Sequence, residues 1–289
     1  MWHEKSVRRK IAFLVISALC VSIILSSETK GGEDSLFKYW QRPVSLQTEK
    51  RKNLYPEACG ECHKEQYPGW KSSLHSRAVG PGLLGQLKPY KDPEFAESCY
   101  FCHAPMMEQS EVRMQGQGAK DKYIKNPYFD DRLKLTGISC AVCHIREGKV
   151  YGPPKKQGQG SRVKGQGARG KRQGKIAHDF IEKDFFEKSG FCAACHQLEE
   201  GYELNGKLLV NTYMEWKESI YGQNNITCQN CHMPDRQHLW RGIHDKERVK
   251  NSVRIETIPF QNGAKLVITN SGVGHLFPTY VTPLIVIKG

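Results

Sequence analysis

The stretch Cys192-Ala193-Ala194-Cys195-His196 is one of five copies of the pattern Cys-x-x-Cys-His in a chain of 289 residues. The copies lie at residues 59–63, 99–103, 140–144, 192–196 and 228–232. They use ten of the eleven cysteines, and the remaining one, Cys20, lies near the N-terminus. In c-type haem attachment, the two thiols of this pattern form thioether bonds to the porphyrin and the histidine binds the iron. The sequence therefore predicts five covalently attached haem c groups.

Each motif assigns two attachment points and one iron ligand. The cysteines expected to carry haem are Cys59, Cys62, Cys99, Cys102, Cys140, Cys143, Cys192, Cys195, Cys228 and Cys231. The histidines expected to bind iron from the proximal side are His63, His103, His144, His196 and His232. A zinc site explains the pattern less well, because zinc usually takes its four ligands from two such pairs and five copies pair badly. The histidine directly after the second cysteine also has no role in a zinc ribbon, and five thioredoxin-like dithiols fit so specific a motif still less well.

The first 30 residues are expected to be an export signal. Basic residues precede an apolar run over residues 11–25, and a polar stretch follows it. The run is shorter than the ~20 residues that a membrane-spanning helix usually needs, but no clear cleavage site precedes Glu28. Residues 1–30 are thus either a signal peptide or an N-terminal membrane anchor, and residues 31–54 are a linker. Both alternatives place the remaining chain in the periplasm or on the outer face of the inner membrane.

Positive charge is concentrated in one segment. The chain has a formal net charge of +13, and residues 150–175 contain eight Lys and Arg residues but no Asp or Glu. The segment is rich in Gly and lacks apolar periodicity, which predicts a flexible loop. It is either a solvated insertion, or residues 155–175 steer the protein to an acidic redox partner or an anionic membrane surface. Nucleic acid is not an expected partner of an exported haem protein.

The expected fold is mainly α: a haem-packed multihaem cytochrome domain with little regular structure over residues 55–250. Because the chain is only moderately apolar, the porphyrins must supply much of the buried surface, and the chain without haem should be largely unfolded. Helical spacing of apolar residues predicts short helices at residues 63–76, 176–189 and 211–221. Residues 251–289 are expected to be an incomplete β-domain. Its strands are expected at residues 253–258, 265–269 and 282–287, with a hairpin turn at Asn262-Gly263.

Two local patterns occur twice. Tyr67-x-x-Trp70-Lys71-x-Ser73 recurs as Tyr213-x-x-Trp216-Lys217-x-Ser219. Gly137-Ile138-Ser139, before the third motif, resembles Asn225-Ile226-Thr227, before the fifth. These repeats indicate one internally related haem scaffold rather than independent domains.

Five histidines remain as candidates for the second, distal position on the irons. Eleven histidines are present, five belong to the motifs, and His3 precedes the apolar run. The candidates are His75, His178, His238, His244 and His275. A second strong ligand makes a haem iron a low-spin electron-transfer centre. Methionine ligands are the alternative, although methionine and lone histidine side chains are more often packing residues; these are Met106, Met107, Met214 and Met233.

Three stretches resemble the cytochrome c554-related multihaem cytochromes. The first runs from the motif at Cys59 through Tyr67, Trp70 and Ser73 to His75. The others are His232-Met233-Pro234 followed by His238 and His244, and Gly274-His275-Leu276-Phe277-Pro278-Thr279. The resemblance implies that His75 is a distal haem ligand and that the haems are closely spaced and partly stacked. It does not assign each distal histidine to an iron.

The function expected from these features is electron transfer through mostly bis-histidine haems in the periplasm. Partners would be other redox proteins, such as cytochromes and quinol-linked or periplasmic oxidoreductases. One alternative is an oxidoreductase acting on nitrite- or hydroxylamine-type nitrogen compounds at one open haem. Transfer is favoured because every motif ends in histidine, whereas the pentahaem nitrite reductases that the chain resembles typically carry a lysine in place of the proximal histidine at their catalytic haem. A subunit of an extracellular haem conduit is the other alternative.

Overall fold

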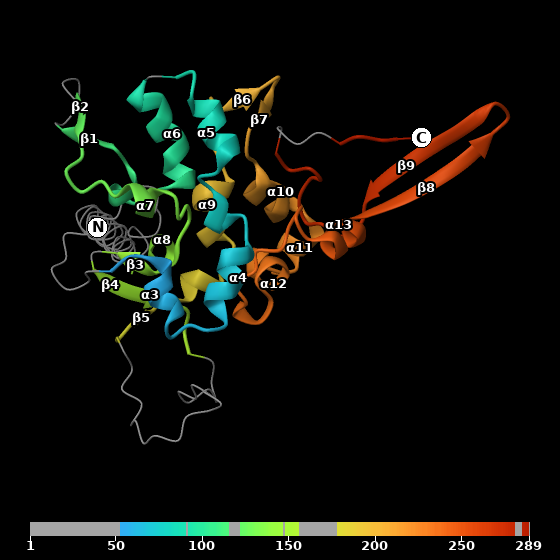
Figure 1. Cartoon of the computed structure of the whole chain (residues 1–289). Coiled ribbons are helices and arrows are strands. Elements are labelled where there is room, and N and C mark those ends of the chain that lie inside the picture. The colour runs from blue at the N-terminus through green and yellow to red at the C-terminus, as the bar shows by residue number, and fades with distance from the viewer. Residues whose placement is uncertain are drawn as a thin grey trace, which may run out of the picture. The chain divides into compact units, whose positions relative to one another are not determined.

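The computed structural model describes residues 53–90, 92–115, 122–146, 148–155, 178–280 and 285–288 (Figure 1). All of them belong to one compact unit, Gln41–Gly289. The expected signal or anchor and residues 156–175 of the basic loop lie outside the described residues. In the part of the chain that is described, no helix has the length and apolar character needed to cross a membrane.

The protein is mainly helical, and its helices are short. The α-helices among the described residues are α3 (Pro56–Gly60), α4 (Gln66–Ser72), α5 (Pro81–Leu87), α6 (Pro93–His103), α7 (Asp131–Lys134), α8 (Cys140–His144), α9 (Gly190–His196), α10 (Thr212–Glu218), α11 (Ile220–Gln223), α12 (Cys228–His232) and α13 (Lys246–Ser252). The 3-10 turns are η1 (His75–Arg77), η2 (Met107–Gln109), η3 (Asp184–Glu187) and η4 (Pro234–Arg236). Helices shorter than ~12–15 residues are marginal in isolation, so packing must hold them.

The strands form small separate sheets. The antiparallel pairs are β1 (Val112–Gln115) with β2 (Lys122–Lys125), β3 (Ile145–Arg146) with β4 (Lys149–Gly152), β6 (Glu203–Leu204) with β7 (Lys207–Leu208), and β8 (Val253–Phe260) with β9 (Gly263–Asn270). A parallel pairing adds β5 (Ile181–Glu182) to β4. Strand β5, which follows residue 177, thus pairs with β4, which follows the third motif.

Two of the three expected helices are confirmed, each with a break. Residues 63–76 contain α4 and the start of η1, and residues 211–221 contain α10 and the start of α11. Both breaks fall at a serine, Ser73 and Ser219, whose hydroxyl donates to the carbonyl three residues before it. The third expectation is wrong: residues 178–189 form β5 and η3 instead of a helix. Their aromatic residues do fall at helical spacing, but Phe185 and Phe186 pack against Phe191 in α9.

The internal repeat has a structural counterpart. In α4 the Trp70 Nε1 atom donates to the carbonyl of Ile138 at 2.7 Å. In α10 the Trp216 Nε1 atom donates to the carbonyl of Ile226 at 2.8 Å. Each isoleucine lies two residues before a haem motif. A tryptophan after the first motif therefore fixes the start of the third, and a tryptophan after the fourth fixes the start of the fifth.

Substitution of Trp70 by phenylalanine should destabilise the protein. The indole is 6% exposed, and its loss leaves the Ile138 carbonyl without its donor, which costs about 1–3 kcal/mol. Thermal unfolding followed at the Soret band measures the effect. Trp216→Phe is the matched control: its hydrogen bond is open to solvent, so water replaces the donor and the loss should stay below about 1 kcal/mol. Equal losses in both variants would contradict the burial argument.

The buried apolar side chains occupy only the first part of the described chain. One cluster contains Met106, Leu133 and Ile145, and a second contains Val79 and Tyr100. Every apolar side chain that is buried in the described residues lies between residues 56 and 151. From residue 178 to residue 280 no apolar side chain is buried; only Ser189 and Ser252 are. That part has no protein core of its own.

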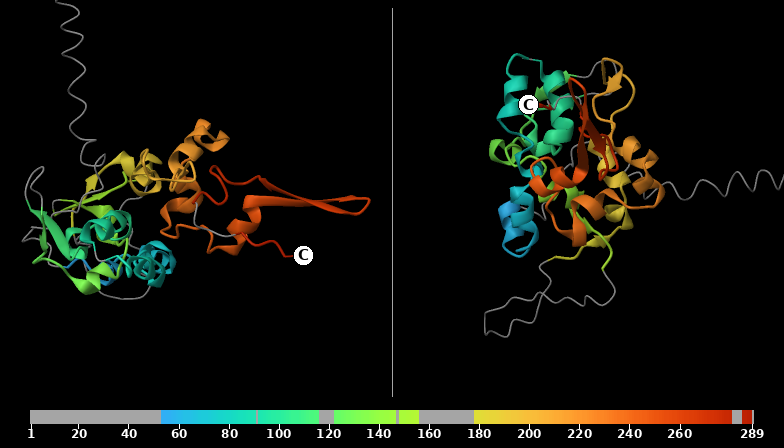
Figure 2. Two further views of the ribbon diagram at one scale, coloured as in Figure 1. Left: turned by 90° about the horizontal axis from the view of Figure 1, so that it is seen from above. Right: turned by 90° about the vertical axis from the view of Figure 1, so that its right-hand side faces the viewer.

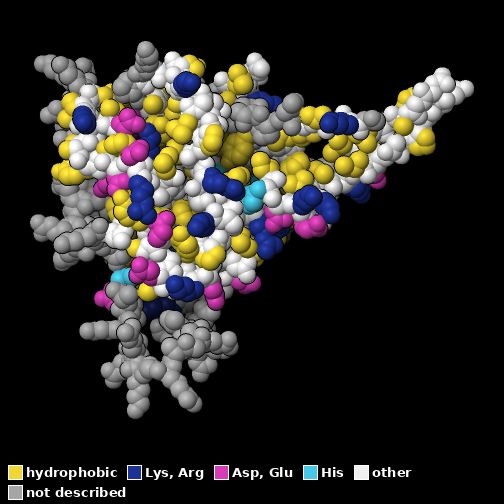
Figure 3. Space-filling view, in the orientation of Figure 1, with side chains coloured by type: hydrophobic (Ala, Val, Ile, Leu, Met, Phe, Trp, Pro, Cys, Tyr) yellow, Lys and Arg dark blue, Asp and Glu magenta, His cyan; other side chains and the backbone are white. Residues whose placement is uncertain are grey.

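The expected hairpin near the C-terminus is confirmed. Strands β8 and β9 pair over eight residues each, from Val253↔Asn270 to Phe260↔Gly263, and the hairpin continues from α13 (Figure 2). Exposed apolar side chains gather along it (Figure 3), including Ile255, Ile268 and Phe260. The expected third strand is not formed at residues 285–287, and residues 282–284 of that expectation lie outside the described residues.

Candidate haem sites

The haem motifs lie on short helices that align their reactive side chains. In a helix, residues i, i+3 and i+4 share a face. The two thiols and the imidazole of each Cys-x-x-Cys-His motif therefore point to one side. The helices α6, α8, α9 and α12 each end at the motif histidine. In the first motif the helical bond from the His63 N–H to the Cys59 carbonyl, at 2.9 Å, continues past the end of α3.

Four motif histidines engage their Nδ1 atoms in hydrogen bonds. A histidine that binds metal through one nitrogen almost always donates the other N–H to a carbonyl or similar group, which fixes the tautomer and ring orientation. The Nδ1 partners are the carbonyl of Ala78 for His103 (2.7 Å), the carbonyl of Tyr151 for His144 (2.8 Å), the carbonyl of Arg241 for His232, and the hydroxyl of Tyr280 for His196 (2.6 Å). The Nε2 atom of each ring is left as the available ligand.

A second histidine ring faces four of the five motif histidines. The pairs, with the distance between ring centres, are His63 and His178 (6.2 Å), His144 and His238 (6.1 Å), His196 and His75 (6.2 Å), and His232 and His275 (6.2 Å). The partners are 115, 94, 121 and 43 residues apart in the sequence. Four of the five distal candidates therefore lie opposite a motif histidine, each opposite a different one.

This separation fits a metal ion between the two rings. A histidine nitrogen lies about 2.0–2.1 Å from a bound metal, and the centre of the ring lies roughly 1.2 Å farther away, so the ring centres of two ligands on opposite sides of one ion are roughly 6.4–6.6 Å apart. Face-to-face stacking without an ion would vary from pair to pair within about 4.5–7 Å. The four measured distances agree within 0.1 Å. The residues present thus fit iron held by paired histidines, with thioether bonds available beside it.

Three of the distal candidates also hydrogen-bond through Nδ1 to a backbone carbonyl. Nδ1 of His238 bonds to the carbonyl of Arg236 at 2.9 Å, Nδ1 of His275 to Leu276 at 2.8 Å, and Nδ1 of His178 to Asp179 at 3.2 Å. The exception is His75, whose buried Nδ1 has no hydrogen-bond partner. A buried polar atom of this kind calls for a bound group, because such atoms are otherwise almost always satisfied.

Burial keeps these imidazoles neutral. It lowers the pKa of His75 to about 3, with His196 adding to the effect, and lowers the pKa of His144 and of His196 to about 4. The pKa of His238 is also lowered by burial. A neutral imidazole presents a lone pair that a metal can accept. The sites therefore offer ligands rather than cations at neutral pH.

Two predicted residues are not brought into such a pair. Among the described residues, no histidine ring faces His103 at this separation. His244 is exposed and faces no motif histidine there, although it is near enough to His75 to lower its pKa. Of the methionine alternatives, Met106 is packed in the first apolar cluster, where it is 1% exposed.

The five motifs form one contiguous group. Thiols of different motifs lie close enough to affect each other's pKa. Cys59 of the first motif raises the pKa of Cys140 in the third, Cys195 of the fourth lowers that of Cys102 in the second, and Cys228 of the fifth raises that of Cys192 in the fourth. Cys143 of the third motif is close enough to Cys195 of the fourth to raise its pKa. The fourth motif thus adjoins the second, third and fifth.

Sequence reasoning missed residues that hold the histidines from behind. Tyr280 supplies the Nδ1 partner of His196, and the ring of Trp240 lies edge-on to His75 at 4.8 Å and to His238 at 5.2 Å. Phe186 stacks on His144 with ring centres 5.2 Å apart. Tyr280 directly follows Thr279 in a stretch that the resemblance covers, and Trp240 lies two residues after His238. Their nearness in sequence to a candidate ligand is the feature that could have predicted these contacts.

Comparison with known proteins gives the same family twice. The family model described as "Cytochrome c554 and c-prime" matches residues 58–145. Cytochrome c-554 of Nitrosomonas europaea is 30% identical over 158 residues, which is 51% of this chain. The chain is related to the cytochrome c554 family. The matched stretch spans 59% of that relative.

A solved structure has a similar fold. A penta-heme cytochrome c552 from Thermochromatium tepidum superposes with a TM-score of 0.52 at 21% identity. The match covers 78% of this chain and 68% of the other. A mainly helical fold is therefore common to this relative of cytochrome c554 and to a structure that carries several haems.

Proposed function

We propose that this chain is a periplasmic pentahaem c-type cytochrome that transfers electrons between redox partners through mostly bis-histidine haems. The observation that carries the proposal is the set of four histidine pairs at 6.1–6.2 Å, each with one motif histidine. Haem iron with two histidine ligands has no vacant position for a substrate, and serves as an electron-transfer centre. The relation to cytochrome c554 supports a c-type cytochrome, and the likeness to a penta-heme cytochrome supports the count of five haems.

The residues have separate roles in this proposal. The ten motif cysteines hold five haem groups covalently, and the motif histidines are the proximal ligands. The distal ligands are His178 for the first motif, His238 for the third, His75 for the fourth and His275 for the fifth. Haem supplies the one-electron chemistry when bound. Backbone carbonyls, and the Tyr280 hydroxyl at His196, fix the tautomers of the rings that bond to them, and the apolar and aromatic neighbours limit the access of water.

The order of the motifs in space supports a branched path. The first motif adjoins the third through Cys59 and Cys140, and the third adjoins the fourth. From the fourth, one branch leads to the second motif and another to the fifth. Electrons that travel between any two of the three ends, at the first, second and fifth motifs, would pass the fourth motif, which holds His196. The partners that we propose are other redox proteins, including cytochromes and quinol-linked or periplasmic oxidoreductases.

A second candidate function rests on His103. Its Nδ1 is bonded to the Ala78 carbonyl as in a proximal ligand, yet no histidine ring in the described residues faces it. An iron held there with an open face could bind a small nitrogen compound such as nitrite or hydroxylamine. The chain would then be an oxidoreductase with four haems as its electron supply. His244 remains the sequence candidate for a ligand to this iron.

Low-temperature electron paramagnetic resonance separates the two functions. Electron transfer predicts low-spin signals from four bis-histidine haems that do not respond to nitrite, nitric oxide or hydroxylamine. If adding one of these compounds changes any signal, the change should be confined to the haem that His103 binds. The reduced protein should pass electrons to an acceptor cytochrome without consuming the nitrogen compounds. Consumption over many turnovers would replace the electron-transfer proposal by the enzymatic one, and several high-spin haems in the resting protein would contradict the ligand pairs.

A further inference from the structure

The chain that follows the fifth motif, on both sides of His238, adopts a backbone conformation that residues with a side chain disfavour. The residues Asp235 and Arg236 have φ angles of 53° and 62°, and Trp240 has a φ of 40°. Residues other than glycine rarely adopt this left-handed region, because Cβ approaches the following carbonyl. Such a conformation persists only where the surrounding structure enforces it. We name residues 233–240 the distal strap.

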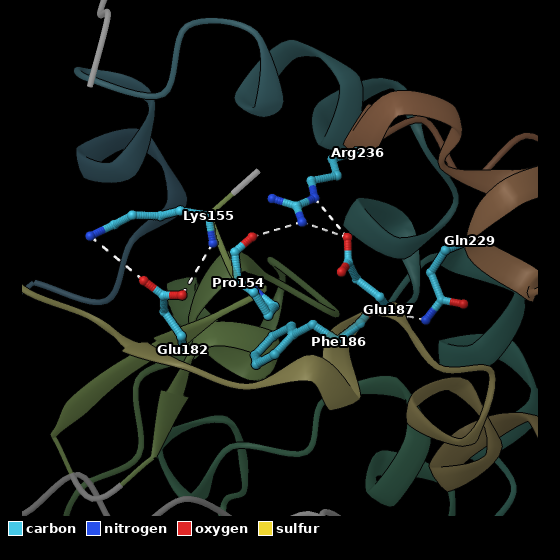
Figure 4. Close-up of polar contacts among 7 residues, drawn as sticks. All are labelled: Pro154, Lys155, Glu182, Phe186, Glu187, Gln229 and Arg236. Carbon is cyan, nitrogen blue, oxygen red and sulfur yellow. Dashed lines mark hydrogen bonds and ion pairs between the residues drawn. The ribbon is translucent and has the colours of Figure 1, made fainter. Parts of the chain in front are cut away.

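The guanidinium of Arg236 anchors the strap to two other segments (Figure 4). Its Nε and Nη2 atoms donate to Oε1 of Glu187, at 2.9 and 2.5 Å, and Nη2 also donates to the carbonyl of Pro154 at 2.8 Å. A planar guanidinium with several fixed donors holds its partners in one geometry. Glu187 lies in η3 beside Phe186, whose ring stacks on His144. The anchor therefore reaches the segment that packs against the opposite ligand.

The backbone of the same residue orients the distal ligand. The carbonyl of Arg236 accepts a hydrogen bond from Nδ1 of His238 at 2.9 Å, which leaves Nε2 of His238 as the ligand atom toward His144. The strap also packs closely on α4, where a Cβ on Gly69 would lie 2.9 Å from the His238 carbonyl oxygen. The position of His238 is thus set from behind by its own strap and by α4.

We propose that Arg236 is a positioning residue for His238: its guanidinium, held by Glu187 and Pro154, stabilises the left-handed turn whose carbonyl directs the imidazole toward His144. This inference rests on the proposed function, in which His144 and His238 are ligands to one iron. Without the anchor, the strap relaxes toward φ angles that L-residues prefer, and the carbonyl of Arg236 leaves Nδ1 of His238. The iron would then lose its distal ligand for part of the time.

The test compares variants of the full haem-loaded chain. Arg236→Gln should produce a high-spin signal from one haem, several-fold above that of the unaltered protein, and one further haem that binds carbon monoxide after reduction. Glu187→Gln should give the same signal at smaller amplitude, because the Pro154 contact remains. Arg254→Gln is the control: it removes an arginine that pairs with Glu256 on the exposed hairpin, and its spectrum should match the unaltered protein.

His238→Ala distinguishes a wrong inference from a wrong ligand. If His238→Ala creates the high-spin haem but Arg236→Gln matches Arg254→Gln, the positioning role of Arg236 is refuted while the ligand pair stands. If His238→Ala leaves the spectrum unchanged, the proposed pair of His144 and His238 is itself overturned. If the Arg236→Gln protein does not accumulate, the Glu187→Gln protein is used instead. A spectrum of Glu187→Gln that matches the unaltered protein would then refute the inference.

Discussion

Replacement of both Cys192 and Cys195 by serine should remove one haem and unfold residues 178–280. The described residues of that part bury no apolar side chain, so the porphyrins must supply its apolar interior. The fourth motif also adjoins three others. Limited proteolysis with mass mapping measures the outcome: cleavage after residue 178 should be at least about tenfold faster, the ratio that a loss of ~1.4 kcal/mol of local stability produces.

The matched control is the same double substitution at Cys99 and Cys102. That motif lies on α6, the longest described α-helix, whose Tyr100 belongs to the second apolar cluster together with Ala104, the residue after the helix. This variant should also lose one haem, as counted by the pyridine haemochrome, but its helix signal in circular dichroism should fall less. Native protease resistance in the Cys192 and Cys195 variant would contradict the view that haem is the core of this part.

The parts of the structure that follow from local sequence could be predicted. The five motifs, the hairpin around Asn262-Gly263 and the helices at α4 and α10 depend on residues within a few positions of one another. The repeated tryptophan was visible as a pattern, and its role became clear only when Trp70 was found to bond to Ile138. Spacing rules describe such local order well, because side chains at i, i+3 and i+4 share a helix face.

The pairing of ligands could not be predicted from spacing. His75 lies opposite His196 and His178 lies opposite His63, and no local rule connects residues more than a hundred positions apart. The expected helix at residues 176–189 failed for a related reason. Apolar spacing indicates a helix when the apolar residues pack along one helix face, but Phe186 packs both on the imidazole of His144 and on Phe191 of α9. A chain built around cofactors places apolar side chains where the cofactors require them.

Substitution of His75 by alanine should convert one haem from low spin to high spin. The ring lies 6.2 Å from His196, its Nδ1 is buried without a hydrogen-bond partner, and burial lowers its pKa to about 3. No other described histidine occupies this position opposite His196, so the iron would lose its distal ligand outright. Electron paramagnetic resonance should show about a fifth of the haem changing spin state, with the potential of that haem altered as its axial ligand is lost.

The control is His244→Ala, which tests whether a histidine that is only near a ligand affects the spin state of a haem. His244 is exposed and faces no motif histidine in the described residues, but it lies near His75. Substitution of His244 should leave the spin state of every haem unchanged if His75 is the distal ligand of the iron that His196 binds. A high-spin haem in the His244 variant would instead assign that histidine to an iron, and His103 is the one that needs it. The two variants thus decide whether four or all five irons carry a distal ligand. They therefore decide whether one iron has a vacant position where a substrate can bind.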